Sequence, residues 1–140
     1  MTMRKVLVPI DGSPGSLRAL EFAARRHGGS QDACLLLLNV QQPMPPSRFV
    51  SRGSIRDHQL RMSEEALVPA RKLCERLGVE FQCYSRVGEP GQLIPSFAKR
   101  TGCKEIVMGT RGLGRVTGLV LGSIATKVIH LATVPVTLVK

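Results

Sequence analysis

The sequence predicts a doubly wound α/β fold built on a five-stranded parallel sheet. Apolar runs of strand length alternate with longer segments of helical spacing, in the order β-α-β-α-β-α-β-α-β, and this alternation is typical of a parallel sheet with helices on both faces. The run Leu35-Leu36-Leu37-Leu38 is apolar without interruption, as in a strand buried on both faces. The 140 residues, 43% of them hydrophobic, suit one domain that spans residues 1–140.

The turn signals between the apolar runs set the expected bounds of each element. The expected elements, in order, are a strand at 4–10, a helix from Pro14 to Gly28, a strand at 33–40, a helix at 59–77, a strand at 79–87, a helix at 89–100, a strand at 105–108, a helix at 123–131 and a strand at 134–139.

The first half of the chain carries the clearest cap and loop signals. After the first strand, Ser13 or Asp11 can cap the helix that begins at Pro14. Residues 41–58 hold several prolines and serines without an apolar period, and they predict a long, weakly ordered loop. In the second helix Pro69 removes a hydrogen bond of the helix and predicts a kink.

The second half is predicted to place two strands near the edges of the sheet. Apolar residues alternate along 79–87, from Val79 to Ser85 and Val87, which indicates a strand with one buried face. The third helix contains Pro95, which is expected to bend or shorten it. The last strand contains Pro135, which an edge strand tolerates at its start.

The composition excludes several classes of protein. Twenty basic and ten acidic residues give a net charge of +10, which invites a nucleic-acid interpretation, but one Tyr and four Phe offer few stacking platforms and argue against nucleic acid as the main partner. No apolar run approaches the roughly 20 residues of a membrane span, and the N-terminus has no signal-peptide pattern, so we expect a cytoplasmic protein without a membrane partner. The four cysteines form no C-x-x-C pair and are interpreted as buried free thiols.

A glycine-rich segment between the fourth strand and the fourth helix carries the functional signal. Glycines stand at positions 109, 112, 114, 118 and 122, and Ser123 follows at the expected helix N-terminus. Such turns bind phosphate, because backbone N–H groups point at the anion and the helix dipole attracts it. We expect a positive φ at Gly122 and a capping role for Ser123. If strands one and four are neighbours, Asp11, Val40 and Gly109 converge on one crevice.

The sequence resembles the universal stress proteins, specifically their ATP-binding subgroup. The resemblance covers nearly the whole chain and rests on V-P-I-D-G-S at residues 8–13, V-G-E-P at 87–90, the spacing G-x-x-G, nine residues, then G-S from Gly109 to Ser123, and V-P-V at 134–136. It implies a Rossmann-like fold of the adenine nucleotide alpha hydrolase type. The chain departs from the family's common pattern at Pro69, Pro95, Lys104-Glu105 and Arg115.

The resemblance also implies a role for individual residues. Asp11 would contact ribose, the backbone of Val40 would bind adenine, and Mg²⁺ would neutralise the phosphates of ATP. The implied nucleotide-binding residues are Pro9, Ile10, Asp11 and Val40 at the base and sugar, Met108 and Gly109 beside the ribose, and Gly112, Gly122, Ser123 and Ile124 around the phosphates. Asp11 as a helix cap alone, and glycines that serve only for tight turns, remain the alternatives.

The sequence offers little for catalysis. His27, His58 and His130 form no cluster by spacing, and Arg111 is equally plausible as a phosphate contact or an exposed loop residue. We therefore assign no catalytic residue or protein metal ligand, and interpret the chain as an ATP-binding, nucleotide-responsive regulator in the stress response. A slow Mg-dependent ATP hydrolase and a nucleotide-free dimeric scaffold are the alternatives. The strand that begins at Val134 and ends at Val139 is expected to pair across a homodimer.

Overall fold

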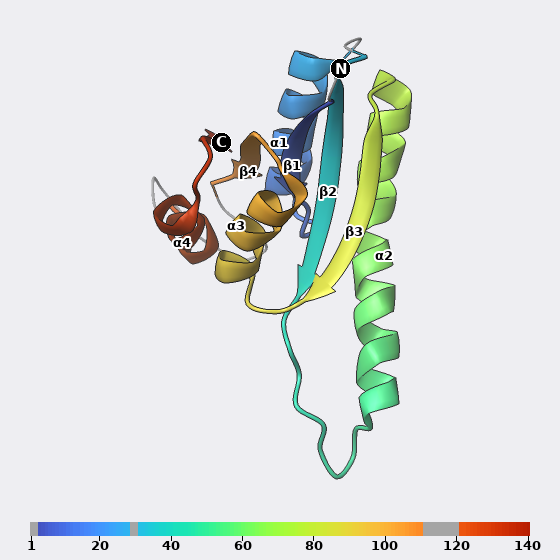
Figure 1. Ribbon diagram of the computed structural model, residues 1–140. Coiled ribbons are helices and arrows are strands. Elements are labelled where there is room, and N and C mark those ends of the chain that lie inside the picture. Colours follow the sequence, from blue (N-terminus) through green and yellow to red (C-terminus); the bar gives the residue numbers. More distant parts are fainter. Residues whose placement is uncertain (1–2, 29–30, 111–120) are drawn as a thin grey trace.

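The computed structural model describes residues 3–28, 31–110 and 121–140 (Figure 1). Strands and helices alternate along these residues in the predicted order. The elements are β1 (Arg4–Pro9), α1 (Pro14–His27), β2 (Ala33–Gln41), α2 (Arg52–Leu77), β3 (Phe81–Val87), α3 (Pro90–Thr101), β4 (Glu105–Gly109), α4 (Ser123–Leu131) and β5 (Val136–Val139).

The strands form one sheet in the order β3-β2-β1-β4-β5, and every neighbouring pair is parallel. β1 lies in the middle and pairs with both β2 and β4, so the chain winds outward from β1 in both directions. The predicted doubly wound α/β fold is confirmed, and strands one and four are neighbours, which is the condition for the convergence of Asp11, Val40 and Gly109. Their C-terminal ends meet at the switch point, where folds of this type bind ligands.

Helices cover both faces of the sheet, and each face has its own apolar core. α1 and α2 pack on the face where Val6 and Val8 are buried, whereas α3 and α4 pack on the face where Leu7 is buried. Successive side chains of a strand point to opposite faces, so one apolar run supplies both cores. β3 and β5 are the edge strands, as predicted, although Ser85 and Val87 of β3 are exposed rather than buried.

The second helix is longer than the sequence predicts. α2 begins at Arg52 instead of residue 59, so the expected loop at 41–58 is confined to residues 42–51. The Ser51 side chain caps the helix by accepting a hydrogen bond from the Ser54 N–H at 3.1 Å. Ile55 is the one buried residue of the early turns, which explains why no apolar period marked them. α2 also continues through Pro69.

Although α2 has 26 residues, neither it nor any other helix of the described chain is both long and apolar enough to cross a membrane.

The cysteines are free thiols, as predicted. Cys34, Cys74 and Cys103 are buried, and Cys83 is half-buried. Burial raises the pKa of Cys74 to about 12, so this thiol stays protonated and unreactive at neutral pH.

A buried charge cluster joins α1 to β4 and β5 at the N-terminal end of β4. Glu105 forms an ion pair with Arg26 and accepts a hydrogen bond from Thr137 Oγ1 at 2.6 Å, and His27 Nε2 lies 3.9 Å from the same carboxylate. Burial raises the pKa of Glu105, but the hydrogen bonds from Thr137 and Arg26 outweigh it and hold the pKa below its usual 4.5. Burial and the nearby Arg26 charge hold the pKa of His27 below 6.5.

Acid is expected to destabilise the fold through this cluster. The pKa values of Glu105 and His27 are lower in the folded than in the unfolded chain, so both groups favour folding at neutral pH. That contribution is lost as the pH falls. The loss begins below the pKa of each group in the unfolded chain, 6.5 for His27 and 4.5 for Glu105, and continues through its lower pKa in the folded chain. Glu105→Gln should lower the free energy of unfolding at neutral pH by about 1–3 kcal/mol, because Arg26 loses its partner.

Urea denaturation across the acidic range measures both effects. Below the usual pKa of a glutamate, Glu105→Gln should lose stability less steeply than the parent protein. Equal slopes in the two proteins would show that Glu105 does not contribute to the acid sensitivity.

Candidate functional site

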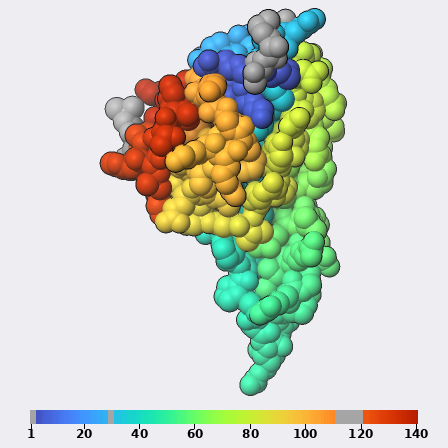
Figure 2. All heavy atoms as spheres, in the orientation of Figure 1, coloured from blue at the N-terminus to red at the C-terminus, as the bar shows by residue number. Residues whose placement is uncertain are grey.

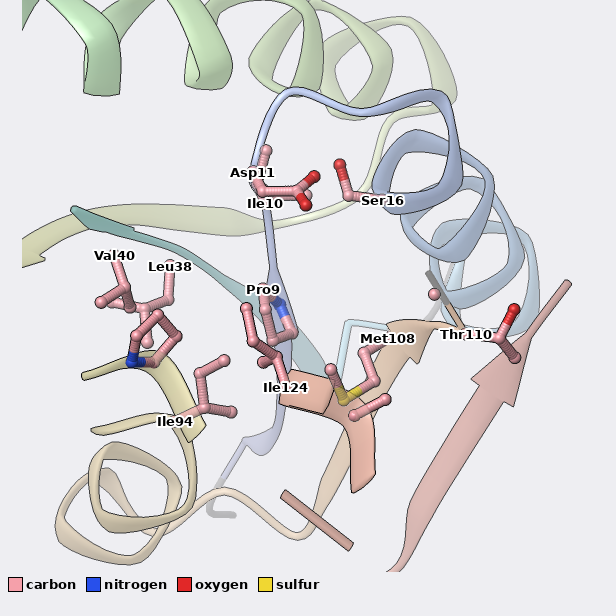
Figure 3. A pocket seen from close by; sticks show the side chains of 13 residues that line it. Pro9, Ile10, Asp11, Ser16, Leu38, Val40, Ile94, Met108, Thr110 and Ile124 are labelled. Carbon is pink, nitrogen blue, oxygen red and sulfur yellow. The ribbon is translucent and has the colours of Figure 1, made fainter. Parts of the chain in front are cut away.

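A hollow opens at the C-terminal ends of β1, β2 and β4, between α3 and α4 (Figure 3). The volume open to the centre of a water-sized sphere is about 90 Å³, and the hollow widens into an open mouth. Apolar side chains of Leu38, Val40 and Ile94 gather on one side of it, and Asp11 and Ser16 lie on another. The residues that line it are Pro9, Ile10, Asp11, Ser16, Leu38, Val40, Pro90, Ile94, Met108, Gly109, Thr110, Ile124 and Ala125.

Seven of the ten residues singled out from the sequence line this hollow. They are Pro9, Ile10, Asp11, Val40, Met108, Gly109 and Ile124. Gly122 and Ser123 stand next to Ile124 at the start of α4 without lining the hollow, and Gly112 lies outside the described residues. The structure therefore brings together residues from β1, β2, β4 and α4 that are far apart in the sequence.

The N-terminus of α4 differs from the expectation in two respects. Gly122, not Ser123, is the N-cap residue, and its φ of −63° is negative, so the expected positive φ is wrong. Ser123 is the first helical residue, and no side chain caps this helix end. The first hydrogen bond of the helix joins the Thr126 N–H to the Gly122 carbonyl at 3.0 Å. The N–H groups of Ser123, Ile124 and Ala125 consequently have no partner within the helix.

The same glycine closes the preceding loop. The Gly122 N–H donates to the Thr110 carbonyl at 2.8 Å, and the Thr110 N–H donates to the Val139 carbonyl at 3.1 Å. These bonds fix the start of α4 against the ends of β4 and β5. The Gly122 N–H is therefore occupied, and the donors that the helix itself leaves without a partner begin at Ser123.

Asp11 supports the cap of α1 instead of capping the helix itself. Its Oδ1 accepts hydrogen bonds from the Ser13 N–H, at 2.9 Å, and from the Ser13 hydroxyl. Ser13 is the N-cap, since its Oγ accepts from the Ser16 N–H at 3.2 Å. Between them, Gly12 has a φ of 86°, a left-handed conformation that favours glycine. Asp11 is thus held in place at the edge of the hollow while being half-buried.

The backbone N–H and C=O of Val40 point toward the β1 side of β2, where the hollow lies. The Leu38 carbonyl accepts a hydrogen bond from the Ile10 N–H, on the β1 side of the strand. The Leu35 N–H and the Gln41 carbonyl form their hydrogen bonds on the β3 side. Alternate residues of a parallel strand bond to opposite neighbours, so Val40 presents its N–H and C=O toward β1. The pairing of β1 with β2 ends at Pro9 and Leu38. The polar groups of Val40 are therefore left without a strand to pair with.

Asn39 is a structural residue of the site that sequence reasoning missed. It is 2% exposed, and its Nδ2 donates to the Ile10 carbonyl at 2.8 Å while its Oδ1 accepts from Gln41 Nε2 at 2.9 Å. These bonds fix the end of β1 against β2 where the hollow begins. A single amide in a run of leucines was the available signal, because a buried amide needs partners.

Glu89 joins the two helices that wall the hollow. Its carboxylate accepts from the N–H groups of Gly91, at 3.0 Å, and Gln92, at 2.9 Å, at the start of α3, and it pairs with Lys127 Nζ of α4 at 3.1 Å. The Lys127 ammonium is the main cause that holds the pKa of Glu89 below its usual range. A Cβ on Gly91 would lie 2.7 Å from Lys127 Cδ, so glycine permits this close approach.

The comparisons with known proteins agree with this geometry. The family model described as "Universal stress protein family" matches residues 2–140. The chain belongs to the universal stress protein family. The universal stress protein YxiE of Bacillus subtilis is 33% identical over 150 residues, which cover 97% of this chain and 98% of that protein.

Solved structures of the family share the fold. The universal stress protein of Archaeoglobus fulgidus superposes with a TM-score of 0.75 at 25% identity, over 100% of both chains. A universal stress protein of the same organism in complex with dAMP has a TM-score of 0.66 at 26% identity, over 99% of this chain and 98% of that one. These likenesses confirm the Rossmann-like fold expected for the family.

The histidines do not form a site. His27, His58 and His130 lie on α1, α2 and α4. Among the residues that the structure describes, no three His, Cys, Asp or Glu side chains come close enough together to hold a metal ion. Of the described residues that line the hollow, Asp11 alone has an ionisable side chain.

Proposed function

We propose that this universal stress protein binds adenine nucleotides in the hollow, with ATP as the physiological ligand, and acts as a nucleotide-responsive regulator. One observation carries the proposal: a largely apolar hollow at the switch point of the sheet adjoins a helix N-terminus whose first N–H groups have no partner within the helix. An apolar wall suits a base, and a helix N-terminus suits phosphate. The dAMP complex of the Archaeoglobus fulgidus relative supports the same class of ligand.

The base would lie against the apolar wall. The unpaired N–H and C=O of Val40 offer one donor and one acceptor, which match the N1 and N6 positions of adenine. Guanine presents the opposite pattern at these positions, so the site should discriminate against it. The free carboxylate oxygen of Asp11 would accept from a ribose hydroxyl, with Met108 and Gly109 beside the sugar.

The phosphates would extend toward α4. The N–H groups of Ser123 and Ile124 are the donors at hand, together with the residues of the glycine loop, Gly112 included. Mg²⁺ is usually held by one or two carboxylates and by phosphate oxygens. Asp11 is the single carboxylate among the described lining residues, so the phosphates would provide most of the ligands.

We propose binding with weak or absent turnover. Efficient hydrolysis needs a group that orients water and groups that stabilise the developing charge. The described lining residues include no histidine, lysine or arginine. A rate of ATP hydrolysis in the parent protein with Mg²⁺ that disappears in Asp11→Asn would support the slow hydrolase instead.

Titration calorimetry tests the proposed function. With Mg²⁺ present, ATP should bind at one site per chain, adenosine more weakly and GTP weakest of all. Asp11→Ala should weaken ATP binding by about 1.5–3 kcal/mol, the contribution of a hydrogen bond to a charged group. Absence of binding by any adenine compound would favour the nucleotide-free scaffold. Unchanged affinity in Asp11→Ala would restrict Asp11 to its support of the Ser13 cap.

We also propose a homodimer through β5. This strand is the outer neighbour of β4. The carbonyl of Pro135, just before β5, accepts a hydrogen bond from the Ile106 N–H, and the carbonyl of Val139 accepts one from the Thr110 N–H just after β4. By alternation, Val136 and Leu138 direct their backbone groups to the open edge. An apolar edge without cover favours pairing with another strand, and two-fold symmetry is the commonest arrangement of oligomers.

Val136→Pro is expected to give monomers. Proline removes an N–H that faces the open edge and leaves the bonds to β4, and the first residue of an edge strand tolerates it. Substitution of Val136 or Leu138 by a charged residue should also give monomers, but both side chains pack on the α3–α4 core and their loss lowers stability. Light scattering at micromolar concentration measures the mass. A parent protein that is already monomeric there would rule the dimer out.

A further inference from the structure

A narrow projection extends from the body of the protein at the end of the sheet where β2 terminates. It consists of residues 42–61, which are the loop after β2 and the first turns of α2, and we call it the α2 projection (Figure 1). In the space-filling view it tapers away from the rest of the molecule (Figure 2). Its apolar and basic side chains take no part in the proposed nucleotide site.

Hydrogen bonds hold the projection in a defined shape. At its base, Gln59 Nε2 donates to the Gln42 carbonyl at 3.0 Å and joins the helix to the loop. At its tip, Ser47 and Val50 exchange two backbone hydrogen bonds of 3.0 and 3.3 Å. Within this turn the Phe49 N–H donates to Ser47 Oγ at 3.3 Å. Phe49 is therefore presented outward by an organised turn.

The tip exposes apolar side chains to solvent. Phe49 is 89% exposed, its sequence neighbour Val50 is exposed, and so is Met44 five residues earlier in the projection. Exposure of a phenylalanine forfeits the favourable free energy of burying it, so a cluster of this kind at a protruding point indicates an interaction surface.

Basic side chains surround and follow this tip. Arg48 is in the tip turn, and Arg52 and Arg56 stand one helical turn apart on α2, with Arg61 further along. Asp57 is the single acidic residue of the projection. In the described part of the chain none of these four arginines belongs to an ion pair. Apolar residues thus occupy the end of the projection, and positive charge lies at and behind it.

We propose that the α2 projection docks on an anionic lipid surface. The apolar tip with Phe49 would enter the boundary between headgroups and acyl chains, and Arg48, Arg52 and Arg56 would lie at the level of the lipid phosphates. This order of apolar tip and basic collar matches the depth profile of a charged membrane interface. The proposal goes beyond nucleotide binding and does not depend on it. It revises the expectation of a protein without a membrane partner, which rested on the lack of an apolar run long enough to span a membrane.

Three features favour lipid over other partners. A second copy would bring the same positive charge to the contact, on a chain of net charge +10. The phosphates of nucleic acid would pair with the arginines, but the aliphatic side chains of Met44 and Val50 would then have no apolar surface to contact. A protein partner would need a pocket that matches a convex tip, whereas a fluid bilayer adapts to it.

Cosedimentation of the whole 140-residue chain with vesicles tests the proposal. The probes are vesicles of phosphatidylcholine alone and vesicles in which about a quarter of the lipid is phosphatidylglycerol. We expect binding to the anionic vesicles that weakens with salt, and none to the neutral ones. Phe49→Ser should reduce the affinity about tenfold, as loss of a buried phenylalanine predicts. The matched control is Phe22→Ser on α1, which removes another exposed phenylalanine and should bind as the parent does.

A second pair of variants separates local charge from total charge. The double variant Arg48→Glu with Arg52→Glu should abolish vesicle binding. The double variant Arg76→Glu with Arg100→Glu, at the ends of α2 and α3, changes the net charge equally and should retain most of the vesicle binding. Equal losses in both pairs, or no binding to anionic vesicles, would overturn the proposal. So would binding of a DNA duplex or polyglutamate that depends on Phe49 while vesicle binding does not. Circular dichroism verifies that each variant is folded.

Discussion

Ser123→Pro is expected to weaken ATP binding about tenfold to a hundredfold while adenosine binds as it does to the parent protein. Proline at the first helical position is compatible with a helix, and the extended conformation of Gly122 (φ −63°, ψ 154°) suits a residue before proline. The substitution therefore removes the Ser123 N–H without disrupting α4. A hydrogen bond to a charged group contributes roughly 1.5–3 kcal/mol, which corresponds to the expected loss of affinity.

Ser123→Ala is the matched control for this variant. It removes the hydroxyl and keeps the N–H, so it should bind ATP nearly as the parent does. Calorimetric titration of both variants with ATP and with adenosine separates the phosphate contribution from that of the base. If Ser123→Pro bound ATP with the parent's affinity, the phosphates would not contact this end of α4.

Val40→Trp is expected to remove binding of every adenine compound, with at least about a hundredfold loss of affinity. Val40 is half-buried at the wall of the hollow, and an indole there would fill the space proposed for the base. Because the hollow is open at its mouth, the larger side chain can extend into it at a modest cost in stability. ATP and adenosine should be affected alike, in contrast to Ser123→Pro.

Val87→Trp provides the comparison. Val87 is exposed at the end of β3, the neighbouring strand, and does not line the hollow. The same calorimetric titrations should give parental affinity for this variant and none for Val40→Trp. Retained ATP binding by Val40→Trp with a native melting temperature would place the base elsewhere.

The sheet could be predicted from the sequence because its strands are marked by composition. The run of leucines in β2 and the apolar residues of β1 and β4 are buried at both faces, and glycine or proline lies at or near the end of each strand. The position of β3 at an edge followed from its alternation of apolar and polar residues. The adjacency of β1 and β4 did not follow from spacing, since parallel pairing is decided by the packing of the crossover helices.

The errors concern places that apolar periodicity does not mark. The early turns of α2 contain one buried residue, Ile55, and form through the cap at Ser51, so apolar periodicity could not find them. At α4 the N-cap is Gly122 with a negative φ, one residue before the expected cap, and its N–H is bonded to the Thr110 carbonyl. The partner of Asn39 is a carbonyl 29 residues away, so the amide beside the run of leucines could indicate a structural role but could not identify the partner.

A crystal structure of the protein with ATP and Mg²⁺ tests the central claim most directly. The account predicts the adenine in the hollow, with its edge within hydrogen-bond distance of the backbone of Val40, and the phosphates within hydrogen-bond distance of the N–H groups of Ser123 and Ile124. An adenine bound away from Val40, or phosphates directed away from the N-terminus of α4, would contradict it.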